Sequence, residues 1–344
     1  MPPATNSKLL IVDGHAYAYR AFHAIRQLTS PTGAPTNAIY GFIKMLDKMR
    51  TQLTPSHAVV VWDGGLAAER MAELPEYKAQ RPPMPADLEA QMDGIVRYLE
   101  AAGITSLCRD GVEADDWIAA IARCASGQIP VVIASSDKDF MQLVSEHIGL
   151  LNPNDKSEKI WGAGDVRAKT GIDPAQIVDW LSLIGDSVDN IPGVAGVGPK
   201  TATDLLQQFG TVDAMYSRLG DVKSERLRSS LAAAEQAVRR NQRLIRLQEN
   251  QPAFGMDEAV IRVPQTDRLR VWFAEWGFRT MLAQLGGSDL RGSLPSAGAG
   301  RSGPLSHKDG SCSGGQGGVP EADPGPHFTA TAEGGSQLSQ GALL

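Results

Sequence analysis

Short apolar runs alternate with helical stretches in the first half of the chain, and this alternation limits the fold more than any other feature. The runs are β-branched, four or five residues long and bounded by turn residues: Leu9–Val12, Ala58–Trp62 and Val131–Ala134. Such runs are typical of strands buried on both faces of a parallel sheet. From Ala38 to Leu53, apolar residues recur at helical spacing. The sequence therefore predicts an α/β fold with a mostly parallel central sheet flanked by helices.

The rest of the chain has a different character. From about Gly171 the signals are mainly helical and are punctuated by Gly and Pro. Residues 287–344 are rich in Gly and Ser with almost no periodic apolar pattern, so they cannot bury enough surface to offset the entropy of ordering. We expect an α/β core over residues 1–170, a helical part over residues 171–286 and a disordered tail over residues 287–344.

Aspartates follow each apolar run within a few residues: Asp13, Asp63, and Asp137 with Asp139. The carboxyl ends of strands in an open α/β sheet are where ligands bind, and three strands would deliver carboxylates to one edge. Each aspartate taken alone has a simpler interpretation as the cap of the following helix. All of them being caps is a much weaker explanation.

Two further acidic groups add to this edge. Glu113, Asp115 and Asp116 stand where a helix begins, a position that acids also favour because of the helix dipole. Asp186 and Asp189 are three residues apart, which lets both face one direction from a helical turn.

Nine carboxylates at one edge would repel one another and would bind protons or cations. Oxygen ligands without Cys or His favour Mg²⁺ or Mn²⁺ over zinc, and a pair of such ions is the usual device for phosphodiester hydrolysis. These nine acids outweigh the net charge of −6, so the rest of the chain carries a positive balance. The overall acidity is therefore compatible with a nucleic-acid substrate.

A glycine-rich hairpin enters a helix at residues 191–202. Gly193, Gly196 and Gly198 would let a backbone approach a duplex closely, and the helix start with Lys200 and Thr201 favours a phosphate. The order of glycines differs from that of the nucleotide-binding P-loop. A purely structural helical hairpin is the alternative.

The segment Glu69–Met84 is polar, rich in Pro, and carries Arg70, Lys78 and Arg81 beside Tyr77. Cations for phosphates and an aromatic ring for a base fit a segment that lies over a nucleic-acid strand. An ordinary solvated pair of helices is the alternative. Arg20 would reach a phosphate from the first helix, and a structural salt bridge explains it nearly as well.

Several features indicate the cellular setting. The three cysteines are scattered, which argues against a disulfide framework or a thiolate zinc site and suits a reducing cytoplasm. No apolar run approaches the roughly 20 residues needed to span a bilayer, and the first residues lack a secretory pattern. We expect a cytoplasmic monomer without membrane contact.

From Leu9 to Leu285 the chain resembles the 5′-to-3′ exonuclease domain of bacterial DNA polymerase I and its stand-alone relatives, the flap endonuclease superfamily with a PIN-like core. The motifs that carry the resemblance are Val12-Asp13-Gly14, Arg20-Ala21-Phe22, Tyr77–Pro83, Glu113–Asp116, Ser136–Phe140 and Gly185–Gly193. All nine acidic positions of the family pattern are filled.

The resemblance implies a role for each of these residues. One metal ion would lie among Glu113, Asp115, Asp137 and Asp139, with Asp13 and Asp63 acting mostly through water. Asp116, Asp186 and Asp189 would help to hold the second ion. Lys78 and Arg81 would contact the scissile phosphate from a helical arch. Residues 193–200 would form a helix–hairpin–helix element that binds duplex backbone and a potassium ion. The implied substrates are 5′ flaps, nicked or gapped duplexes and RNA primers.

Two departures from the family pattern stand out. Trp62 precedes Asp63 where phenylalanine is more usual, and no polymerase follows Leu285, so we expect a stand-alone nuclease. A PIN-type ribonuclease is one alternative, although it would not need the hairpin at residues 193–200. A non-catalytic module that binds DNA junctions is the other, although such a module would be expected to have lost acids.

Overall fold

The computed structural model describes residues 7–249, 251 and 253–288, all of which belong to one compact unit. Its centre is a five-stranded parallel sheet with the order β3-β2-β1-β4-β5. The strands are β1 (Leu9–Asp13), β2 (His57–Val61), β3 (Thr105–Leu107), β4 (Val131–Ala134) and β5 (Ile148–Leu151). The predicted α/β class with a parallel central sheet is confirmed.

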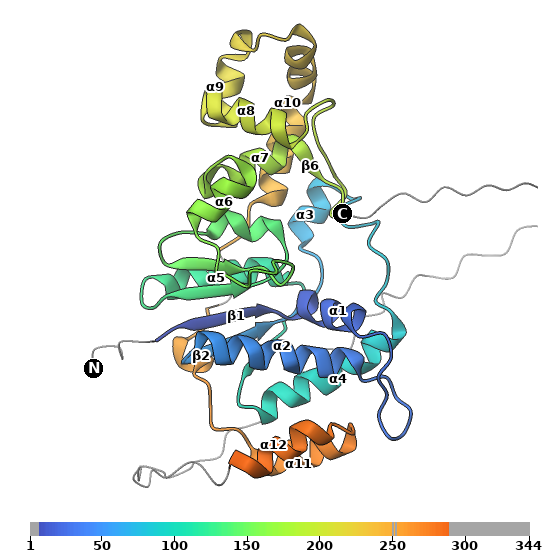
Figure 1. Cartoon of the computed structure of the whole chain (residues 1–344). Coiled ribbons are helices and arrows are strands. Elements are labelled where there is room, and N and C mark those ends of the chain that lie inside the picture. The colour runs from blue at the N-terminus through green and yellow to red at the C-terminus, as the bar shows by residue number, and fades with distance from the viewer. Residues whose placement is uncertain (1–6, 250, 252, 289–344) are drawn as a thin grey trace, which may run out of the picture. The chain divides into compact units, whose positions relative to one another are not determined.

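Successive residues of the central strands face opposite sides of the sheet, and both sides are buried. Leu9 and Ile11 of β1 belong to one apolar cluster, whereas Leu10 and Val12 belong to the other. Figure 1 shows α5 (Ala114–Ser126) on one side of the sheet and helices α2 and α4 on the other. The second side is covered by α1 (Gly14–Ala24), α2 (Asn37–Leu53) and α4 (Ala86–Ala101). Burial on both sides explains why these strands are continuous apolar runs.

The edge strands β3 and β5 are absent from the sequence prediction. β3 has the sequence Thr-Ser-Leu and is half-buried, so its composition resembles a loop. β5 contains Gly149, where a Cβ atom would lie 2.2 Å from Ile160. Both strands are short and owe their conformation to pairing with the sheet, which a local pattern does not reveal.

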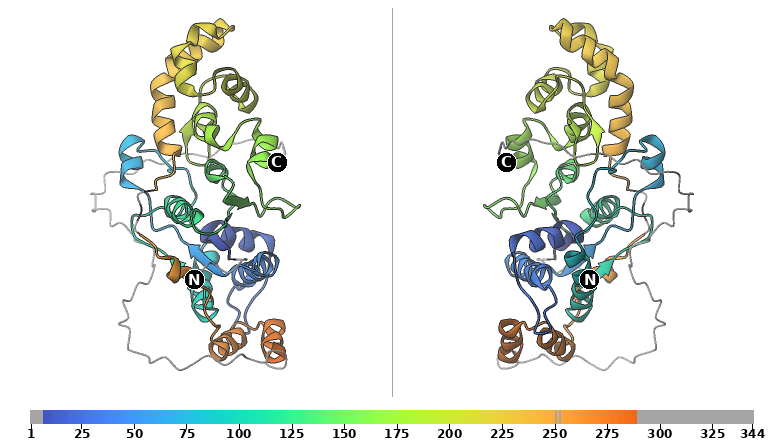
Figure 2. Two further views of the ribbon diagram at one scale, coloured as in Figure 1. Left: turned by 90° about the vertical axis from the view of Figure 1, so that its left-hand side faces the viewer. Right: turned by 90° about the vertical axis from the view of Figure 1, so that its right-hand side faces the viewer.

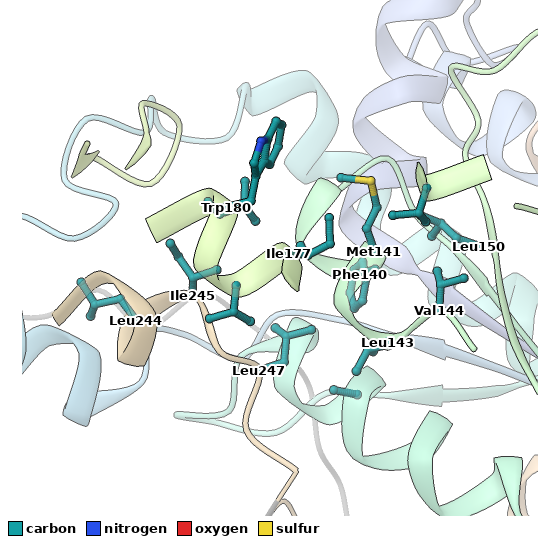
Figure 3. Packing of buried hydrophobic residues seen from close by; sticks show 14 of the residues in the cluster. Phe140, Met141, Leu143, Val144, Leu150, Ile177, Trp180, Leu244, Ile245 and Leu247 are labelled. Carbon is teal, nitrogen blue, oxygen red and sulfur yellow. The ribbon is translucent and has the colours of Figure 1, made fainter. Parts of the chain in front are cut away.

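The helical part begins beyond residue 162 and contains a small two-stranded hairpin. Its elements are α6 (Ala163–Thr170), η2 (Pro174–Gln176), α7 (Ile177–Ile184), β6 (Gly185–Asp186), β7 (Ile191–Pro192), α8 (Pro199–Phe209), α9 (Val212–Ser217), η3 (Leu219–Asp221) and α10 (Glu225–Ile245). Figure 3 shows how it joins the sheet: Phe140 of η1 (Lys138–Leu143) lies near Ile177 of α7, with Ile245 of α10 on the other side of that helix. One continuous cluster of buried apolar side chains therefore packs α7 and α10 against the α/β part of the chain.

After α10 the chain returns to the far side of the sheet. It passes through η4 (Met256–Ala259), and Ile261 and Arg262 donate backbone hydrogen bonds to Ser56 and Gly103. Helix α11 (Thr266–Glu275) then lies beside α4, and α12 (Arg279–Ser288) packs against α11 (Figure 2). The expected helical part over residues 171–286 thus ends on the α/β core and does not form one separate body.

Two remaining features concern the ends and surface of the molecule. The predicted disordered tail lies outside the described residues, apart from residues 287 and 288 at the end of α12. None of the helices formed by residues 7–288 combines the length and apolarity that a membrane crossing requires.

Candidate active site

Two of the aspartates that follow the central strands, Asp13 and Asp137, act as helix caps and also face a common cavity. Asp13 Oδ1 accepts a hydrogen bond from the backbone N–H of Ala16 at 3.0 Å and so caps α1, while its Oδ2 accepts from the Ser135 hydroxyl at 2.7 Å. Asp137 Oδ1 accepts from the backbone N–H of Asp139 at 2.9 Å and caps η1. The capping and ligand interpretations of the sequence are therefore compatible, because a carboxylate has several lone pairs.

A cavity of about 390 Å³ lies at this edge of the sheet. Six of the nine predicted metal ligands line it: Asp13, Asp63, Asp115, Asp137, Asp186 and Asp189. The side chains of His15, Tyr19, Arg81, Ser136 and Lys138 complete the polar part of the wall. A larger groove of about 780 Å³ lies at the end of α1, but Asp87 is its only acidic lining residue. The acidic lining, and not the volume, therefore identifies the smaller cavity as the candidate site.

The carboxylates of this cavity, together with Asp139, which is not among its lining residues, raise one another's proton affinity. Burial, together with the charges of Asp137 and Asp63, raises the pKa of Asp13 to about 6. Burial and the charge of Asp137 raise the pKa values of Asp115 and Asp139 well above the ordinary value. The pKa values of Asp63 and Asp137 are raised for the same primary reason. Crowded acids with raised pKa values are a site where a bound cation would relieve repulsion.

Unsatisfied oxygens mark the same place. The Oδ1 atoms of Asp63 and Asp139 are buried without a hydrogen-bond partner among the described residues. As the side chains stand, no three Asp, Glu, His or Cys side chains within the described part of the chain converge closely enough to hold an ion. The donor set therefore fits divalent cations in chemistry and charge, and binding would require side-chain adjustment.

Glu113 does not line the cavity, because four donors hold its carboxylate behind the wall. Its Oε1 accepts from the backbone N–H of Ala67 at 2.9 Å, and its Oε2 lies 2.7 Å from Lys78 Nζ and 3.2 Å from the Tyr77 hydroxyl. Arg70 Nη1 lies 3.3 Å from the same Oε2. Burial opposes ionisation, yet Lys78 and Arg70 keep the pKa of Glu113 below its ordinary value.

The predicted phosphate-binding residues Lys78 and Tyr77 are buried. Lys78 is 5% exposed, and its φ of +56° is in the left-handed region, an uncommon conformation for a residue with a side chain. Tyr77 is 3% exposed, with its hydroxyl directed at Glu113 and Asp189. The expectation that the Tyr77 ring stacks on a base is not met in this arrangement, because the ring lies in the core and is covered by Lys78.

The other basic residues of the site lie at the cavity wall or beside it. Arg81 Nη2 bonds to Asp189 Oδ1 at 2.6 Å, and Lys138 Nζ lies 3.2 Å from Asp186 Oδ2. Arg20 is half-buried and donates to Asn154 in the loop after β5, so it does not contact the predicted ligands. Asp116 also lies outside the cavity, since Arg70 binds both of its carboxylate oxygens.

The glycine hairpin divides into an anchored part and an open part. Val194 and Val197 are buried, and a Cβ atom at Gly193 would lie 2.2 Å from the Ile184 carbonyl oxygen. Packing within the protein therefore requires glycine at position 193, and the approach of Gly193 to a duplex stays a prediction. Gly196, with φ of +82°, and Gly198 have open space around them. Lys200 is exposed and Thr201 half-buried in the first turn of α8.

Sequence reasoning gave a role to Arg81 but missed four other polar residues of the cavity wall: His15, Tyr19, Ser136 and Lys138. His15 accepts the backbone N–H of Asp63 at Nδ1, at 3.1 Å, which assigns the ring proton to Nε2. Lys138 lies between the two predicted ligands Asp137 and Asp139 in the sequence, and this position alone could have indicated that its side chain lies at the site. The position of His15, two residues after Asp13, was a weaker indication of the same kind.

Comparison with known proteins finds similarity to exonucleases over residues 8–267. The protein-family model of the 5′–3′ exonuclease N-terminal resolvase-like domain matches residues 8–171. The family model of the 5′–3′ exonuclease C-terminal SAM fold matches residues 172–267. A 5′–3′ exonuclease of Aquifex aeolicus is 42% identical over 60% of this chain and 71% of that protein. DNA polymerase I of Pseudomonas aeruginosa is 44% identical over 63% of this chain, but the match spans only 24% of the polymerase.

Solved structures share the fold. The T5 5′-exonuclease with bound divalent metal ions (zinc) superposes with a TM-score of 0.58 at 22% identity, covering 82% of this chain and 98% of that one. The catalytic core of Rad2 in complex with DNA substrate superposes with a TM-score of 0.57 at 18% identity, covering 81% and 93%. Since both family models match in consecutive order and the Aquifex exonuclease is similar over most of its length, the chain belongs to the 5′–3′ exonuclease family.

Proposed function

We propose that this chain hydrolyses DNA phosphodiesters next to single-strand junctions as a 5′ nuclease that depends on two divalent cations. The observation that carries the proposal is the cavity lined by six aspartates, four of which have raised pKa values. Such a set is costly unless cations bind to it. The similarity to the Aquifex 5′–3′ exonuclease and to the nuclease part of DNA polymerase I supports the same activity.

The acids would divide between two ions. Asp115, Asp137 and Asp139, with Asp13, Asp63 and Glu113 around them, would hold the first, and Asp186 and Asp189 the second. Oxygen donors favour Mg²⁺, with Mn²⁺ as a substitute. When bound, such ions stabilise charge on the attacking and leaving oxygens of a phosphodiester.

Basic side chains around the acids would orient the phosphate. Arg81 and Lys138 lie at the cavity wall, where a phosphate oxygen can replace Asp189 or Asp186 as their partner. Lys78 is held on Glu113 and would reach the phosphate only after the segment Glu69–Met84 moves. His15 would present its Nε2 proton to a phosphate oxygen or a water molecule.

The open part of the hairpin would bind duplex backbone. Gly196, Gly198, Lys200 and Thr201 present backbone N–H groups and one cation at the start of α8, a favourable place for phosphate. A K⁺ ion held by hairpin carbonyls would assist this contact. We propose 5′ flaps, nicked or gapped duplexes and primer RNA on DNA as substrates, for a monomer that acts in the cytoplasm in replication and repair.

Cleavage of a 5′-labelled DNA flap duplex tests the proposal. We expect a short product cut near the junction in Mg²⁺, none in EDTA and none with Asp137→Asn. Asp93→Asn is the matched control, because Asp93 is an exposed acid on α4 whose side chain is 82% accessible. It should cleave like the unaltered chain.

The same experiment separates the alternatives. Cleavage of an RNA strand of the same sequence, with the DNA flap left intact, would favour a PIN-type ribonuclease. Tight binding of the junction without cleavage in Mg²⁺ or Mn²⁺ would identify a non-catalytic binding module.

A further inference from the structure

Arg70 is the most fully bonded side chain around the candidate active site. It lies in α3 (Ala68–Glu73) and is 6% exposed. Its Nε donates to the Leu244 carbonyl at 2.9 Å, and its Nη2 lies 3.3 Å from the Arg246 carbonyl. Its two terminal nitrogens bond to the two carboxylate oxygens of Asp116 at 2.6 and 2.8 Å, and Nη1 also faces Glu113 at 3.3 Å. The guanidinium therefore makes four hydrogen bonds and one further ion-pair contact.

Asp116 is equally saturated. It is 2% exposed, and its Oδ1 also accepts the backbone N–H of Gln248 at 2.8 Å. Asp115 and Asp116 are consecutive in the first turn of α5, and consecutive helical residues point in directions about 100° apart. Asp115 lines the cavity, so Asp116 is directed away from it.

We propose that Asp116 is not a ligand of either metal ion, and that Arg70 and Asp116 together form a positioning pair for the nuclease reaction. The inference rests on the proposed function, because it concerns which acids serve the ions. A bidentate arginine–carboxylate pair sets both distance and direction, which a single hydrogen bond does not. This pair joins three segments: α3, the start of α5 and the chain leaving α10 at residues 244–248.

The pair also controls the catalytic acids indirectly. Arg70 and Lys78 share Glu113 Oε2, so the position of Arg70 contributes to where Glu113 and Lys78 lie. Arg70 and Lys78 both belong to the segment Glu69–Met84. Loss of the pair would free this segment while leaving the aspartates of the cavity in place.

Titration calorimetry with Mn²⁺, without DNA, separates ligand from anchor. Asp116→Asn keeps the shape of the side chain and removes its charge, and its neighbour Asp115→Asn is the matched variant. We expect Asp116→Asn to bind the same number of ions with affinity changed less than about 10-fold, below the usual effect of losing an outer-shell partner of a ligand. Asp115→Asn should lose at least about 10-fold in affinity or one of the bound ions.

Two Arg70 variants test the positioning role. Arg70→Lys keeps the charge but lacks the planar fork, so it should not restore what Arg70→Gln loses. For both, we expect single-turnover cleavage of the flap duplex at saturating DNA to fall at least about 10-fold, because Lys78 is misplaced. The affinity for that duplex should change less than about threefold, because the hairpin is untouched.

Limited trypsin digestion gives a readout independent of activity. Lys78 is 5% exposed in the intact protein, so cleavage after it should be slow. We expect cleavage there at least about 10-fold faster in both Arg70 variants and in Asp116→Asn, with unchanged rates after exposed Lys200 as the internal control.

Each outcome has a distinct meaning. Loss of one bound ion in Asp116→Asn, with Lys78 still protected, would make Asp116 a ligand and overturn the inference. Full cleavage activity in Arg70→Lys would mean that Arg70 acts only through its charge, and this result would also overturn the inference. If the unaltered chain neither binds Mn²⁺ nor cleaves DNA, the proposed function fails, and with it the catalytic meaning of the pair. Trypsin cleavage would still report whether the pair anchors the segment.

Discussion

Single carboxylates in this site have properties that depend on their neighbours more than on their own residue type. Asp13 is buried, accepts two hydrogen bonds and faces two other acids, and burial outweighs the hydrogen bonds in its pKa. Glu113 is as buried as Asp13, but two cations lower its pKa. Residue type and position along the chain would not distinguish the two.

The stability of the folded protein should fall as pH rises, because acids of the cavity have raised pKa values. Asp13 titrates at about 6 in the folded protein, against an ordinary value of 3.8. Between these values the folded state binds more protons than the unfolded state, so stability falls as pH rises, by about 3 kcal/mol at most from this group. We expect a lower melting temperature at pH 7 than at pH 5 in EDTA, and recovery at pH 7 with Mg²⁺. Asp13→Asn should flatten the EDTA profile, and an unchanged profile would contradict the assignment.

Asp137 is the acid whose loss should separate chemistry from binding. Its carboxylate lines the cavity and caps η1, and Asn retains the cap acceptor. We expect Asp137→Asn to reduce the cleavage rate more than about 100-fold, beyond the loss typical of an outer-shell partner. Junction affinity, measured in Ca²⁺ by fluorescence anisotropy, should remain within about threefold. Near-native turnover would remove Asp137 from the set of ligands.

At the scale of elements, the glycine hairpin before α8 shows two different reasons for glycine. Gly193 lies against the Ile184 carbonyl, whereas Gly198 precedes α8 in open space. The sequence places both in one motif and assigns both to DNA. Only the packing of Gly193 against the end of α7 distinguishes them.

Alanine at these two glycines should have opposite consequences. Gly193→Ala would force the backbone away from Ile184 and should lower the free energy of unfolding by about 1–3 kcal/mol. Gly198→Ala should cost less, about 0.5–1 kcal/mol for replacing the N-cap glycine of α8, and should weaken duplex binding. Urea unfolding and anisotropy on the same preparations measure both quantities. Equal destabilisation by the two variants would contradict the division of the hairpin.

Lys200 tests the duplex contact of this element by its salt dependence. It is exposed at the start of α8 and would neutralise one phosphate. We expect Lys200→Ala to weaken binding of all duplex sequences alike and to reduce the slope of log affinity against log salt by about 0.9. Binding measured between 50 and 200 mM KCl gives the slope, about 0.9 being the value for one phosphate. An unaltered slope would place Lys200 away from the duplex.

At the scale of the whole molecule, the chain leaves the α/β core and later returns to it. It leaves the α/β core after α5 and β5, builds the helices α6 to α10, and returns to cover the opposite side with α11 and α12. Trp272 and Phe273 of α11 pack with Tyr98 of α4, far from the carboxylates. This return closes the second apolar cluster and contributes stability without touching the site.

Removing a large side chain from this return should affect stability alone. Trp272 is 4% exposed, and truncation of a buried tryptophan typically costs about 3–5 kcal/mol. We expect Trp272→Ala to lower the melting temperature markedly while the cleavage rate per folded molecule and the Mn²⁺ affinity stay unchanged. Val271→Ala, on the 69% exposed neighbour, is the control and should have little effect. A loss of activity without loss of stability would connect α11 to the site.

The sequence by itself determined the three central strands of the sheet, their parallel direction and the edge at which acids gather. Continuous apolar runs followed by Asp13, Asp63 and Asp137 are a local signal, and parallel strands place their carboxyl ends together. Only the tertiary structure decided which acid faces the cavity and which faces Arg70. That choice depends on Arg70 meeting the carbonyl of Leu244, which is 174 residues away. Contacts over such separations follow from packing of the whole chain, and no local pattern encodes them.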